Sequence, residues 1–361
     1  MGDLASIGSG RDYKHLSSGN IPVYGTGGYM LSVNEYLSDK DAIGIGRKGT
    51  IDKPYILNAP FWTVDTLFFV VPKNQVDLQY LFSVFQKIYW KKYDESTGVP
   101  SLSKQSIDNI TIYSAFYEEQ KRIGKFVGKL EYLITLHQRK VEQLEQLKNT
   151  LLSKMFPKSG TNIPEIRFSG FTDAWKQRKL SQILLERNQQ SIQTDEYPLV
   201  SFTVENGVTP KTERYDREQL VTGDKDKKKY KITKYDDIVY NPANLKFGAI
   251  SRNKYGNAVF SPIYVTFEVN KNDYLPSFIE YYVIRWDFIN YALRFQQGTV
   301  YERQSVNVAD FLKLRFCSPD KTYQGKLSSL FIIIDDYIAI HQRKLEQLKN
   351  LKQTLLNKMF I

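Results

Sequence analysis

The sequence predicts an α+β protein in which two unlike globular domains, each of mixed α and β structure, are separated by two long helices that pair with each other. Three observations predict this fold class. A segment near the middle of the chain recurs at its end, and both copies carry the apolar spacing of a coiled coil. The stretches ahead of the two copies are rich in short β-type runs and do not resemble each other. The chain therefore contains an internal duplication.

Composition agrees with a folded chain of about two domains. Its 361 residues are 42% hydrophobic and 25% charged, which are values for globular proteins. The formal charge of +11 favours a polyanionic partner, either nucleic acid or an anionic membrane surface. The single cysteine, Cys317, excludes an internal disulfide, and three histidines argue against a structural metal. Without a signal-peptide core or a run of roughly 18 apolar residues, we expect a cytoplasmic protein.

The repeat organises the chain. HQRKVEQLEQLKNTLLSKMF at 137–156 and HQRKLEQLKNLKQTLLNKMF at 341–360 are identical at 15 of 20 positions, at an offset of 204. The offset continues upstream without a gap, which makes the repeat unit about 54 residues long, starting near Ser103 and near Asn307. The upstream matches are Ile107, Ile110, Ile112 and Gln120 with Phe311, Leu314, Phe316 and Gln324.

Apolar residues in each copy step by three and four, which predicts a heptad seam. A helix from about 119 to 156 would be on the order of 55 Å long, too long for one small core, so its expected partner is its own copy. Two ordinary amphipathic helices are the alternative. We expect buried contacts rather than ligands at both histidines, and Leu147 and Leu351 widen the stripes. The seam residues are Ile123, Val127, Leu130, Ile134, His137, Val141, Leu144 and Leu151, then Leu327, Phe331, Ile334, Ile338, His341, Leu345, Leu348 and Leu355.

The predicted boundaries follow from the repeat. Short β-type runs such as FWTVDTLFFVVP at 61–72 precede a helical pattern in each unlike segment. Proline and glycines at 158–173 indicate a linker. We expect a first domain at 1–113, a first spacer helix at 114–157, a linker at 158–174, a second domain at 175–317 and a second spacer helix at 318–361.

Turns in both domains carry chemistry that suits DNA. Glycine-rich turns at 21–29 and 44–50 let main-chain amides approach a phosphate closely. Turns at 241–256 and 296–305 carry Asn, which can pair with adenine, and Arg, which can pair with guanine. Each residue alone could be a solvated surface side chain, so the hypothesis rests on the clusters. The candidate DNA contacts are Tyr24, Thr26, Arg47, Lys48, Lys104, Asn244, Lys246, Arg252, Lys254, Tyr301 and Arg303.

Several short segments resemble catalytic motifs but lack the residues or the spacing that those motifs require. GIGRKGT at 44–50 lacks the spacing of a phosphate-binding P-loop. NPAN at 241–244 lacks the second proline and the aromatic residue of the tetrapeptide with which amino-methyltransferases hold their target amine, and no cofactor-binding motif precedes it. No nuclease-like cluster of acidic residues with lysine is evident in the sequence. We therefore predict no catalytic, cofactor-binding or metal-binding residue in this chain.

Taken together, the sequence resembles the specificity subunit of type I restriction-modification enzymes. The resemblance covers almost the whole chain. It is carried by the repeats ending LLSKMF and LLNKMF, by IPVYGTGGY, by LSKQSIDNITI leading into EEQKRIG, and by RFSGFTDAWKQRKL at 167–180. It implies two target recognition domains, each reading one half of a bipartite, asymmetric DNA site. It also implies a pseudo-twofold, antiparallel coiled-coil pair of helices that fixes the spacer between the two halves.

The resemblance also implies partners. The chemistry would lie in two modification subunits, which bind S-adenosylmethionine and methylate adenine, and in restriction subunits, which use ATP and magnesium to translocate and cleave DNA. This chain would be non-catalytic alone. It departs from the family pattern because WKQRKL at 175–180 has no counterpart before the first domain, so we expect a first strand and its capping contacts to be missing.

Two other functions remain open. A free-standing DNA-binding regulator would bind its site without partner subunits. A scaffold would bind proteins through the same domains, although the basic loops argue against it. Salt-dependent DNA binding would separate the scaffold from the other two functions.

Overall fold

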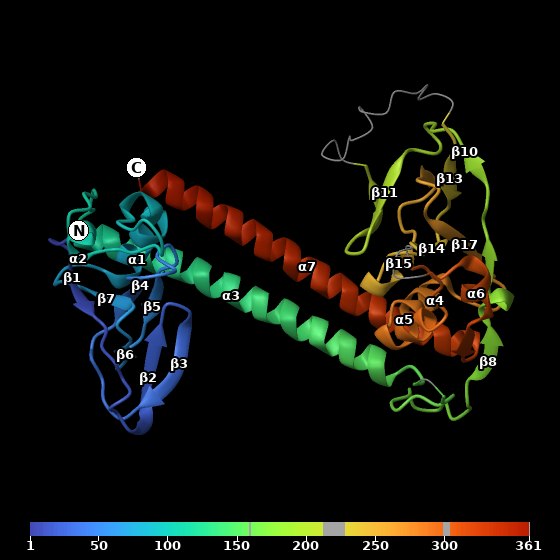
Figure 1. Ribbon diagram of the computed structural model, residues 1–361, viewed down its shortest axis with the longest axis horizontal. Coiled ribbons are helices and arrows are strands. Elements are labelled where there is room, and N and C mark those ends of the chain that lie inside the picture. The colour runs from blue at the N-terminus through green and yellow to red at the C-terminus, as the bar shows by residue number, and fades with distance from the viewer. Residues whose placement is uncertain (159, 212–227, 299–303, 361) are drawn as a thin grey trace. The chain divides into compact units, whose positions relative to one another are not determined.

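A computed structural model describes residues 1–158, 160–211, 228–298 and 304–360. They form two compact units. Unit 1 comprises Met1–Val141 and Ile340–Ile361, and unit 2 comprises Glu142–Ala339. Each unit combines one globular part with segments of two long helices, α3 (Tyr117–Lys154) and α7 (Lys321–Met359) (Figure 1). Unit 1 is therefore built from two segments that are far apart in sequence, whereas unit 2 is one continuous segment.

The globular part of unit 1 contains two small sheets and the helix α1. One sheet has the order β1-β7-β4-β5 and is antiparallel throughout. The other has the order β3-β2-β6, with β2 and β6 parallel. The elements are β1 (Ala5–Ser9), β2 (Ser18–Gly25), β3 (Gly28–Val33), β4 (Ala42–Gly46), β5 (Tyr55–Leu57), β6 (Trp62–Thr63), β7 (Leu67–Pro72), α1 (Leu78–Lys87), the short helix η1 (Trp90–Tyr93) and α2 (Lys104–Asp108).

The core of unit 1 lies between the larger sheet and α1. Asp77 caps this helix by accepting a hydrogen bond from the main-chain nitrogen of Tyr80, which satisfies one of the free amides of the first turn. Leu81 and Phe85, one turn apart, are fully buried with Ile43 of β4. The helical pattern expected after the β-type run at 61–72 is therefore a helix at 78–87, which covers one face of the sheet.

The globular part of unit 2 is larger, and its described residues form four small sheets. Their orders are β15-β14-β17-β9, β10-β13-β16, β11-β12 and β18-β8. The strands are β8 (Lys176–Lys179), β9 (Leu184–Glu186), β10 (Gln190–Ser191), β11 (Val200–Thr203), β12 (Gly207–Pro210), β13 (Tyr230–Thr233), β14 (Ile238–Tyr240), β15 (Ile250–Arg252), β16 (Ala258–Phe260), β17 (Val265–Val269) and β18 (Arg315–Ser318). The helices are η2 (Leu180–Gln182), η6 (Leu245–Phe247), α4 (Pro276–Val283), α5 (Trp286–Leu293) and α6 (Val308–Lys313).

The two long helices pair in antiparallel directions. In unit 1, the Nδ1 atoms of His137 and His341 are 2.9 Å apart, and Glu131 forms an ion pair with Lys352. Residue numbers therefore rise along one helix while they fall along the other. Among the described residues, no helix combines the length and apolar character that a membrane crossing requires.

Unit 2 contains the same pairing. Lys148 of α3 binds Asp335 of α7 with 2.6 Å between Nζ and Oδ1. Just after α3 ends, Phe156 packs against Phe331 of α7, with ring centroids 6.0 Å apart. The fold is thus α+β with an internal duplication and an antiparallel helix pair.

The predicted seam residues are buried to different degrees. Two residues predicted at the edge of the seam, Leu147 and Leu351, do not belong to it. Leu147 and Leu351 do not widen the stripes, because both are nearly half exposed. Leu152 and Leu356 are buried in their place. A strict seven-residue repeat drifts by about 20° per heptad around a straight helix, which rotates the later residues into the interface. Buried seam residues are Val127, Leu130, Val141, Leu327, Phe331, Ile334, Ile338 and Leu348, and partly buried ones are Ile123, Ile134, His137, Leu144, Leu151, His341, Leu345 and Leu355.

A buried glutamine at the start of α3 ties the helix to its globular part. Gln120 Oε1 accepts a hydrogen bond from the main-chain nitrogen of Asp77, the N-cap of α1, at 3.0 Å. Its Nε2 donates to Ser114 Oγ at 3.1 Å and to the carbonyl of Ala115 at 2.8 Å. One side chain therefore fixes the end of the loop before α3 against the start of α1.

The same arrangement recurs in unit 2. Gln324 Oε1 accepts from the main-chain nitrogen of Leu275, the N-cap of α4, at 3.0 Å. Its Nε2 donates to Ser318 Oγ at 3.2 Å and to the carbonyl of Pro319 at 3.1 Å. Because these residues lie 204 positions after Gln120, Ser114 and Ala115, the duplication extends from the sequence to the hydrogen bonds.

Candidate nucleic-acid interface

The glycine-rich turn at 21–29 is a tight hairpin. Strands β2 and β3 pair up to Gly28, whose φ of +105° favours glycine. The ring of Tyr24 lies 6.4 Å from that of Tyr29 and 6.2 Å from that of Tyr55. Burial, with Tyr24 nearby, raises the pKa of Tyr55, so its hydroxyl stays a donor and binds the main chain of the hairpin. Thr26 therefore lies at the tip of the hairpin, two residues after Tyr24.

The turn at 44–50 adjoins a second loop. The main-chain nitrogen of Arg47 donates to the carbonyl of Thr66 at 2.8 Å, and the carbonyl of Arg47 accepts from Leu102 at 2.9 Å. Lys48 forms an isolated bridge with Ser101. These contacts hold residues 47–50 beside residues 100–102, immediately before Lys104 at the start of α2.

The structure separates the candidates of unit 1 into two groups. Tyr24 and Thr26 belong to the hairpin, whereas the exposed side chains of Arg47, Lys48 and Lys104 belong to the adjoining loops. Within the described residues, no hydrogen bond or ring contact joins the groups. An interface that used all five would have to span both surfaces.

In unit 2 the NPAN segment forms a turn after β14. The main-chain nitrogen of Asn244 donates to the carbonyl of Asn241 at 3.1 Å, and Gly248, with φ of +85°, ends the short helix η6. Lys246 is exposed, and its Nζ lies 5.1 Å from the centroid of the exposed Phe247 ring. This turn presents a cation and an aromatic face to solvent.

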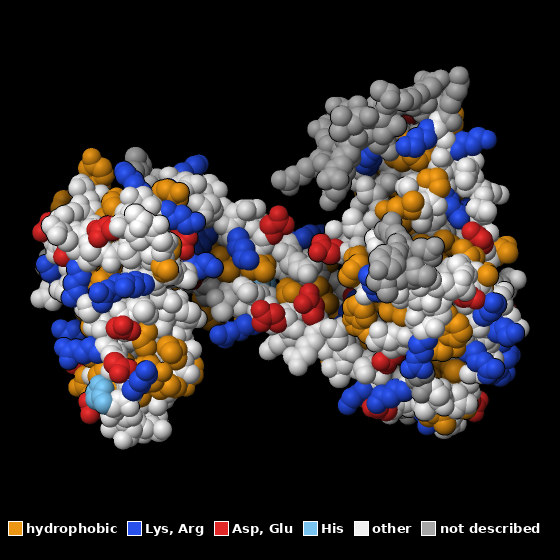
Figure 2. Space-filling model, viewed as in Figure 1, with side chains coloured by type: hydrophobic (Ala, Val, Ile, Leu, Met, Phe, Trp, Pro, Cys, Tyr) orange, Lys and Arg blue, Asp and Glu red, His pale blue; other side chains and the backbone are white. Residues whose placement is uncertain are grey.

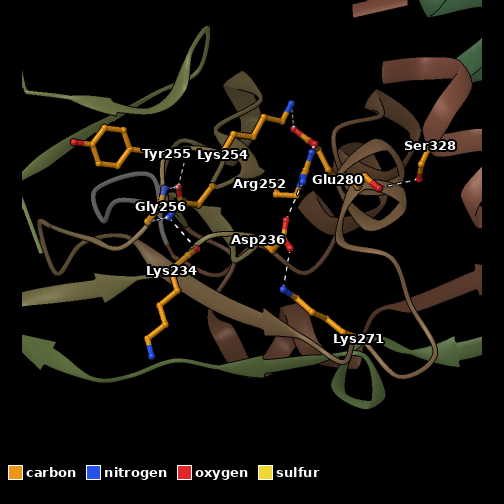
Figure 3. A network of polar contacts seen from close by, with 11 residues as sticks. Lys234, Asp236, Arg252, Lys254, Tyr255, Gly256, Lys271, Glu280 and Ser328 are labelled. Atoms are coloured by element: carbon orange, nitrogen blue, oxygen red, sulfur yellow. Dashed lines mark hydrogen bonds and ion pairs between the residues drawn. The ribbon is translucent and has the colours of Figure 1, made fainter. Parts of the chain in front are cut away.

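Arg252 is enclosed by carboxylates, as Figure 3 shows. Its Nε donates to Glu280 Oε2 at 3.0 Å and its Nη1 to Asp236 Oδ1 at 2.9 Å. The side chain is 12% exposed. Although burial opposes ionisation of Asp236, hydrogen bonds from Lys271 and Arg252 lower its pKa. The guanidinium of Arg252 is therefore occupied by ion pairs within unit 2, which leaves it poorly placed to contact a base.

Lys254 lies at the open side of the same network. Its Nζ is 2.9 Å from Glu280 Oε1, and its side chain is 53% exposed. The buried Asn253 fixes this turn, because its Nδ2 donates to Thr233 Oγ1 at 2.9 Å and its Oδ1 accepts from the main-chain nitrogen of Tyr255 at 2.8 Å. Lys254 and Tyr255 are thus held outward by a side chain that points inward.

Sequence reasoning missed two kinds of residue. Asn253 organises a turn, and its signal is an asparagine three positions before Gly256, which has φ of +132°. Exposed aromatic side chains were also overlooked, although Tyr29 and Phe247 lie close in sequence to candidate residues and could stack on bases.

The remaining candidates stay predictions. Tyr301 and Arg303 lie outside the described residues. Figure 2 shows lysine and arginine side chains distributed over the visible face of both units, interspersed with acidic groups. The charge alone therefore does not single out one binding surface.

Comparison with known proteins shows which proteins this chain is similar to. Residues 1–146 match the family model of the type I restriction modification DNA specificity domain. A curated relative, the type I restriction enzyme MjaVIII specificity subunit of Methanocaldococcus jannaschii, is 25% identical over 177 residues, which cover 47% of this chain and 37% of the relative. The crystal structure of the S subunit of a type I restriction-modification system from M. genitalium has the same fold, with a TM-score of 0.70, 11% identity, and coverage of 99% of this chain and 94% of that one.

Proposed function

We propose that the chain is a specificity subunit of a type I restriction-modification enzyme and that it reads a bipartite, asymmetric DNA site. One half of the site would be read by the globular part of unit 1 and the other half by that of unit 2. The protein would be non-catalytic alone and would act in the cytoplasm. S-adenosylmethionine, ATP and magnesium would be bound by partner subunits.

One observation carries this proposal: a duplicated framework bears two unlike domains. Gln120 and Gln324 make equivalent hydrogen bonds at equivalent positions, whereas the sheets ahead of them differ in number, order and register. Equivalent helices suit two copies of one partner. Unlike sheets suit two different base sequences. Together these features fit an asymmetric target that is served by identical modification subunits.

The DNA contacts would come from the outward-facing turns. Phosphate contacts suit Lys48, Lys104 and Lys254, because lysine is a flexible point charge that fixes orientation without reading sequence. Base contacts suit Asn244, whose side chain type can pair with adenine, and Arg47, which can pair with guanine. The aromatic surface of the β2–β3 hairpin would pack in a groove.

The partner contacts would come from the helices. Leu136 of α3 and its repeat equivalent, Ile340 of α7, are 48% and 52% exposed. Apolar side chains left open at the same position of both copies suit two similar docking surfaces for two modification subunits. Restriction subunits would join the complex to translocate and cleave DNA. The length of the helix pair would fix the spacer of the DNA site.

Co-expression with a modification subunit that forms a complex with this chain tests the proposal. Long-read sequencing of the host genome would then locate methylated adenines. We expect methylation at one split, asymmetric motif that disappears without this chain. Exchange of residues 1–113 should change one half of the motif, and exchange of 175–317 the other half.

Two other results of this experiment would lead to different conclusions. If no complex forms and the chain alone binds one DNA site in a salt-dependent manner, it is a free-standing DNA-binding regulator. If the exchange of either domain leaves the motif unchanged, the proposal that each domain reads one half of the DNA site is wrong.

The spacer has its own test. Insertion of one seven-residue heptad into both helices lengthens the pair by about 10 Å at 1.5 Å per residue, close to three base pairs of B-DNA at about 3.4 Å each. We expect a correspondingly longer spacer in the methylated motif. A motif with the original spacer would show that the helices do not set it.

A further inference from the structure

Unit 2 contains a cavity that the candidate DNA contacts do not use. It is lined by residues of the segment after α3, of the start of α5 and of β18, and its volume is about 240 Å³. Both charged and aromatic side chains line it. Those that bear on its chemistry are Lys158, Arg285, Asp287, Phe288, Tyr291 and Arg315.

Arg285 places a buried positive charge in this cavity. It is 6% exposed, and its guanidinium lies 4.3 Å from the ring centroid of Tyr282 and 4.7 Å from that of Phe156. Its Nε donates to the carbonyl of Tyr282 at 3.2 Å, and its Nη1 donates to that of Pro157 at 3.4 Å. No described carboxylate forms an ion pair with it. Rings and carbonyls therefore orient this charge without neutralising it.

The corresponding turn of unit 1 is built without a buried charge. In both units an isoleucine, Ile88 or Ile284, is the C-cap of one helix, and the next residue is the N-cap of the following helix. That next residue is Tyr89 in unit 1, which is 71% exposed, and Arg285 in unit 2. The turn therefore does not require a buried arginine. Because enclosing an unpaired charge is costly, an anion bound in the cavity would offset that cost.

The start of α5 offers further donors to an anion. Its N-cap, Arg285, makes no side-chain capping bond, and no described acceptor binds the main-chain nitrogens of residues 286–288. Asp287 and Phe288 of this first turn line the cavity. Free amides and the positive end of the helix dipole favour an anion at such a position.

The exposed charges of the lining act in opposite directions. Arg315 donates from Nη1 to the uncharged side-chain oxygen of Gln177 at 2.8 Å, so its charge is not compensated. Lys158 already has a carboxylate partner. Asp287 is exposed and forms no ion pair with a described residue. Two uncompensated positive charges, on Arg285 and Arg315, therefore meet one negative charge.

We propose that this cavity binds a small phosphate-type oxyanion, either the free ion or a phosphate monoester, through the guanidinium of Arg285 and the first amides of α5. The planar fork of arginine matches two oxygens of one anion. The rings of Phe288 and Tyr291 offer an apolar surface to the organic part of an ester. Because Arg285 is nearly buried, a small ligand can reach it, whereas the backbone of a stiff duplex cannot.

Calorimetric titration of the full chain with inorganic phosphate and with adenosine 5′-monophosphate, at constant ionic strength, measures this binding. We expect saturable binding at one site, with slower hydrogen exchange of the amides at 286–288. Tighter binding of the monophosphate would identify an ester as the preferred ligand. Equal or weaker binding of the monophosphate would identify the free ion.

Asp287→Asn tests the site by a gain of affinity, which a folding defect cannot imitate. Removal of the carboxylate that repels the anion should tighten binding about threefold. Glu196→Gln is the matched control, because it removes one negative charge from an exposed residue of unit 2 that does not line the cavity. It should leave the affinity unchanged. Arg285→Lys keeps the charge but loses the planar fork, and it should weaken binding about tenfold or more.

Four results would overturn the proposal. They are no saturable binding of either ligand, equal gains from Asp287→Asn and Glu196→Gln, wild-type affinity in Arg285→Lys, and displacement of bound phosphate by duplex DNA. The second result would mean that the general surface charge attracts phosphate, and the fourth would assign the cavity to the DNA backbone. The titrations with small ligands use no DNA, so they succeed or fail independently of the proposed function.

Discussion

The two units share a framework and differ in what surrounds it. In both, a buried glutamine of a long helix binds the N-cap of a shorter helix and the loop before its own helix. The sheets, by contrast, have no common order. Contacts that fix the helices are thus repeated, whereas surfaces that face outward are not. The duplication separates what must be equivalent from what must differ.

The units also differ in how they hold their basic side chains. In unit 1, the Arg47 loop is fixed by main-chain hydrogen bonds, which leave its side chain exposed. In unit 2, Arg252 is bound by two carboxylates and enclosed. A basic residue in a turn is therefore not by itself evidence of a DNA contact, because a neighbouring carboxylate can form an ion pair with it.

The largest expected difference concerns the phenylalanines that end the two repeats. Phe156 is fully buried among Trp175, Phe278 and Phe331, whereas Phe360 is partly exposed against Tyr80. Phe156→Ala should cost unit 2 about 3–5 kcal/mol. Phe360→Ala should cost unit 1 clearly less, because part of its ring already faces solvent.

Hydrogen exchange during chemical denaturation, read separately for amides of the two units, measures both effects. Equal losses would contradict the comparison. A loss of stability in unit 2 that is caused by Phe360→Ala would also contradict it.

The carboxylate network predicts opposite roles for two neighbouring basic residues. Arg252→Ala leaves Glu280 and Asp236 without their enclosed partner, which should destabilise unit 2 by about 3 kcal/mol. Lys254→Ala should change stability little, because its side chain is half exposed. It should instead weaken DNA binding by the full complex and lower the slope of log affinity against log salt by about one.

Denaturation of the free chain and salt-dependent binding of the complex separate the two residues. Wild-type stability in Arg252→Ala would show that the network is not a brace. An unchanged salt slope in Lys254→Ala would remove that residue from the interface.

The glutamines test the shared framework. Gln120→Ala and Gln324→Ala each leave a buried main-chain nitrogen and other polar groups unpaired, which should cost about 1–3 kcal/mol in the unit concerned. Gln324→Leu and Gln120→Leu serve as matched variants that restore volume but not hydrogen bonds. We expect each variant to increase hydrogen exchange at the start of its own helix, near Asp77 or Leu275. A variant that acts only on the other unit would contradict the equivalence.

The helices and the duplication could be predicted from sequence because their signal is periodic and repeated. Fifteen identities at one offset, with apolar steps of three and four, leave few other structures. Leu147 was misplaced because the heptad pattern does not show how far the seam drifts around the helix. The alternation of short strands indicated β structure, but the division into small sheets depends on pairings between distant residues.

The candidate interface was harder to predict because exposure depends on neighbours that are distant in sequence. Arg252 meets Glu280, 28 positions away, and no local pattern marks that contact. Tyr113 is 87% exposed, and no signal in the sequence distinguishes it from a buried strand residue.

The smallest effect is expected where the two repeats meet each other at the same position. The Nδ1 atoms of His137 and His341 are 2.9 Å apart, so one must donate and the other accept, and the bond requires at least one neutral ring. Burial, with His341 and Lys344 nearby, lowers the pKa of His137. A histidine whose native pKa lies below its unfolded value of about 6.5 binds fewer protons in the folded state. Stability should therefore be full above about pH 6.5 and fall as the pH drops through the lowered native pKa.

Thermal unfolding between pH 7.5 and 5, compared with the double variant His137→Leu and His341→Leu, isolates this contribution. We expect the variant to lose part of the acid sensitivity of the wild type, since leucine fits the apolar seam and cannot take up a proton. The variant should also show slower exchange of helix amides near residues 137 and 341 at pH 5. If wild type and variant lose stability in parallel, the acid sensitivity arises from groups other than this pair, and the contact between the repeats is one of packing alone.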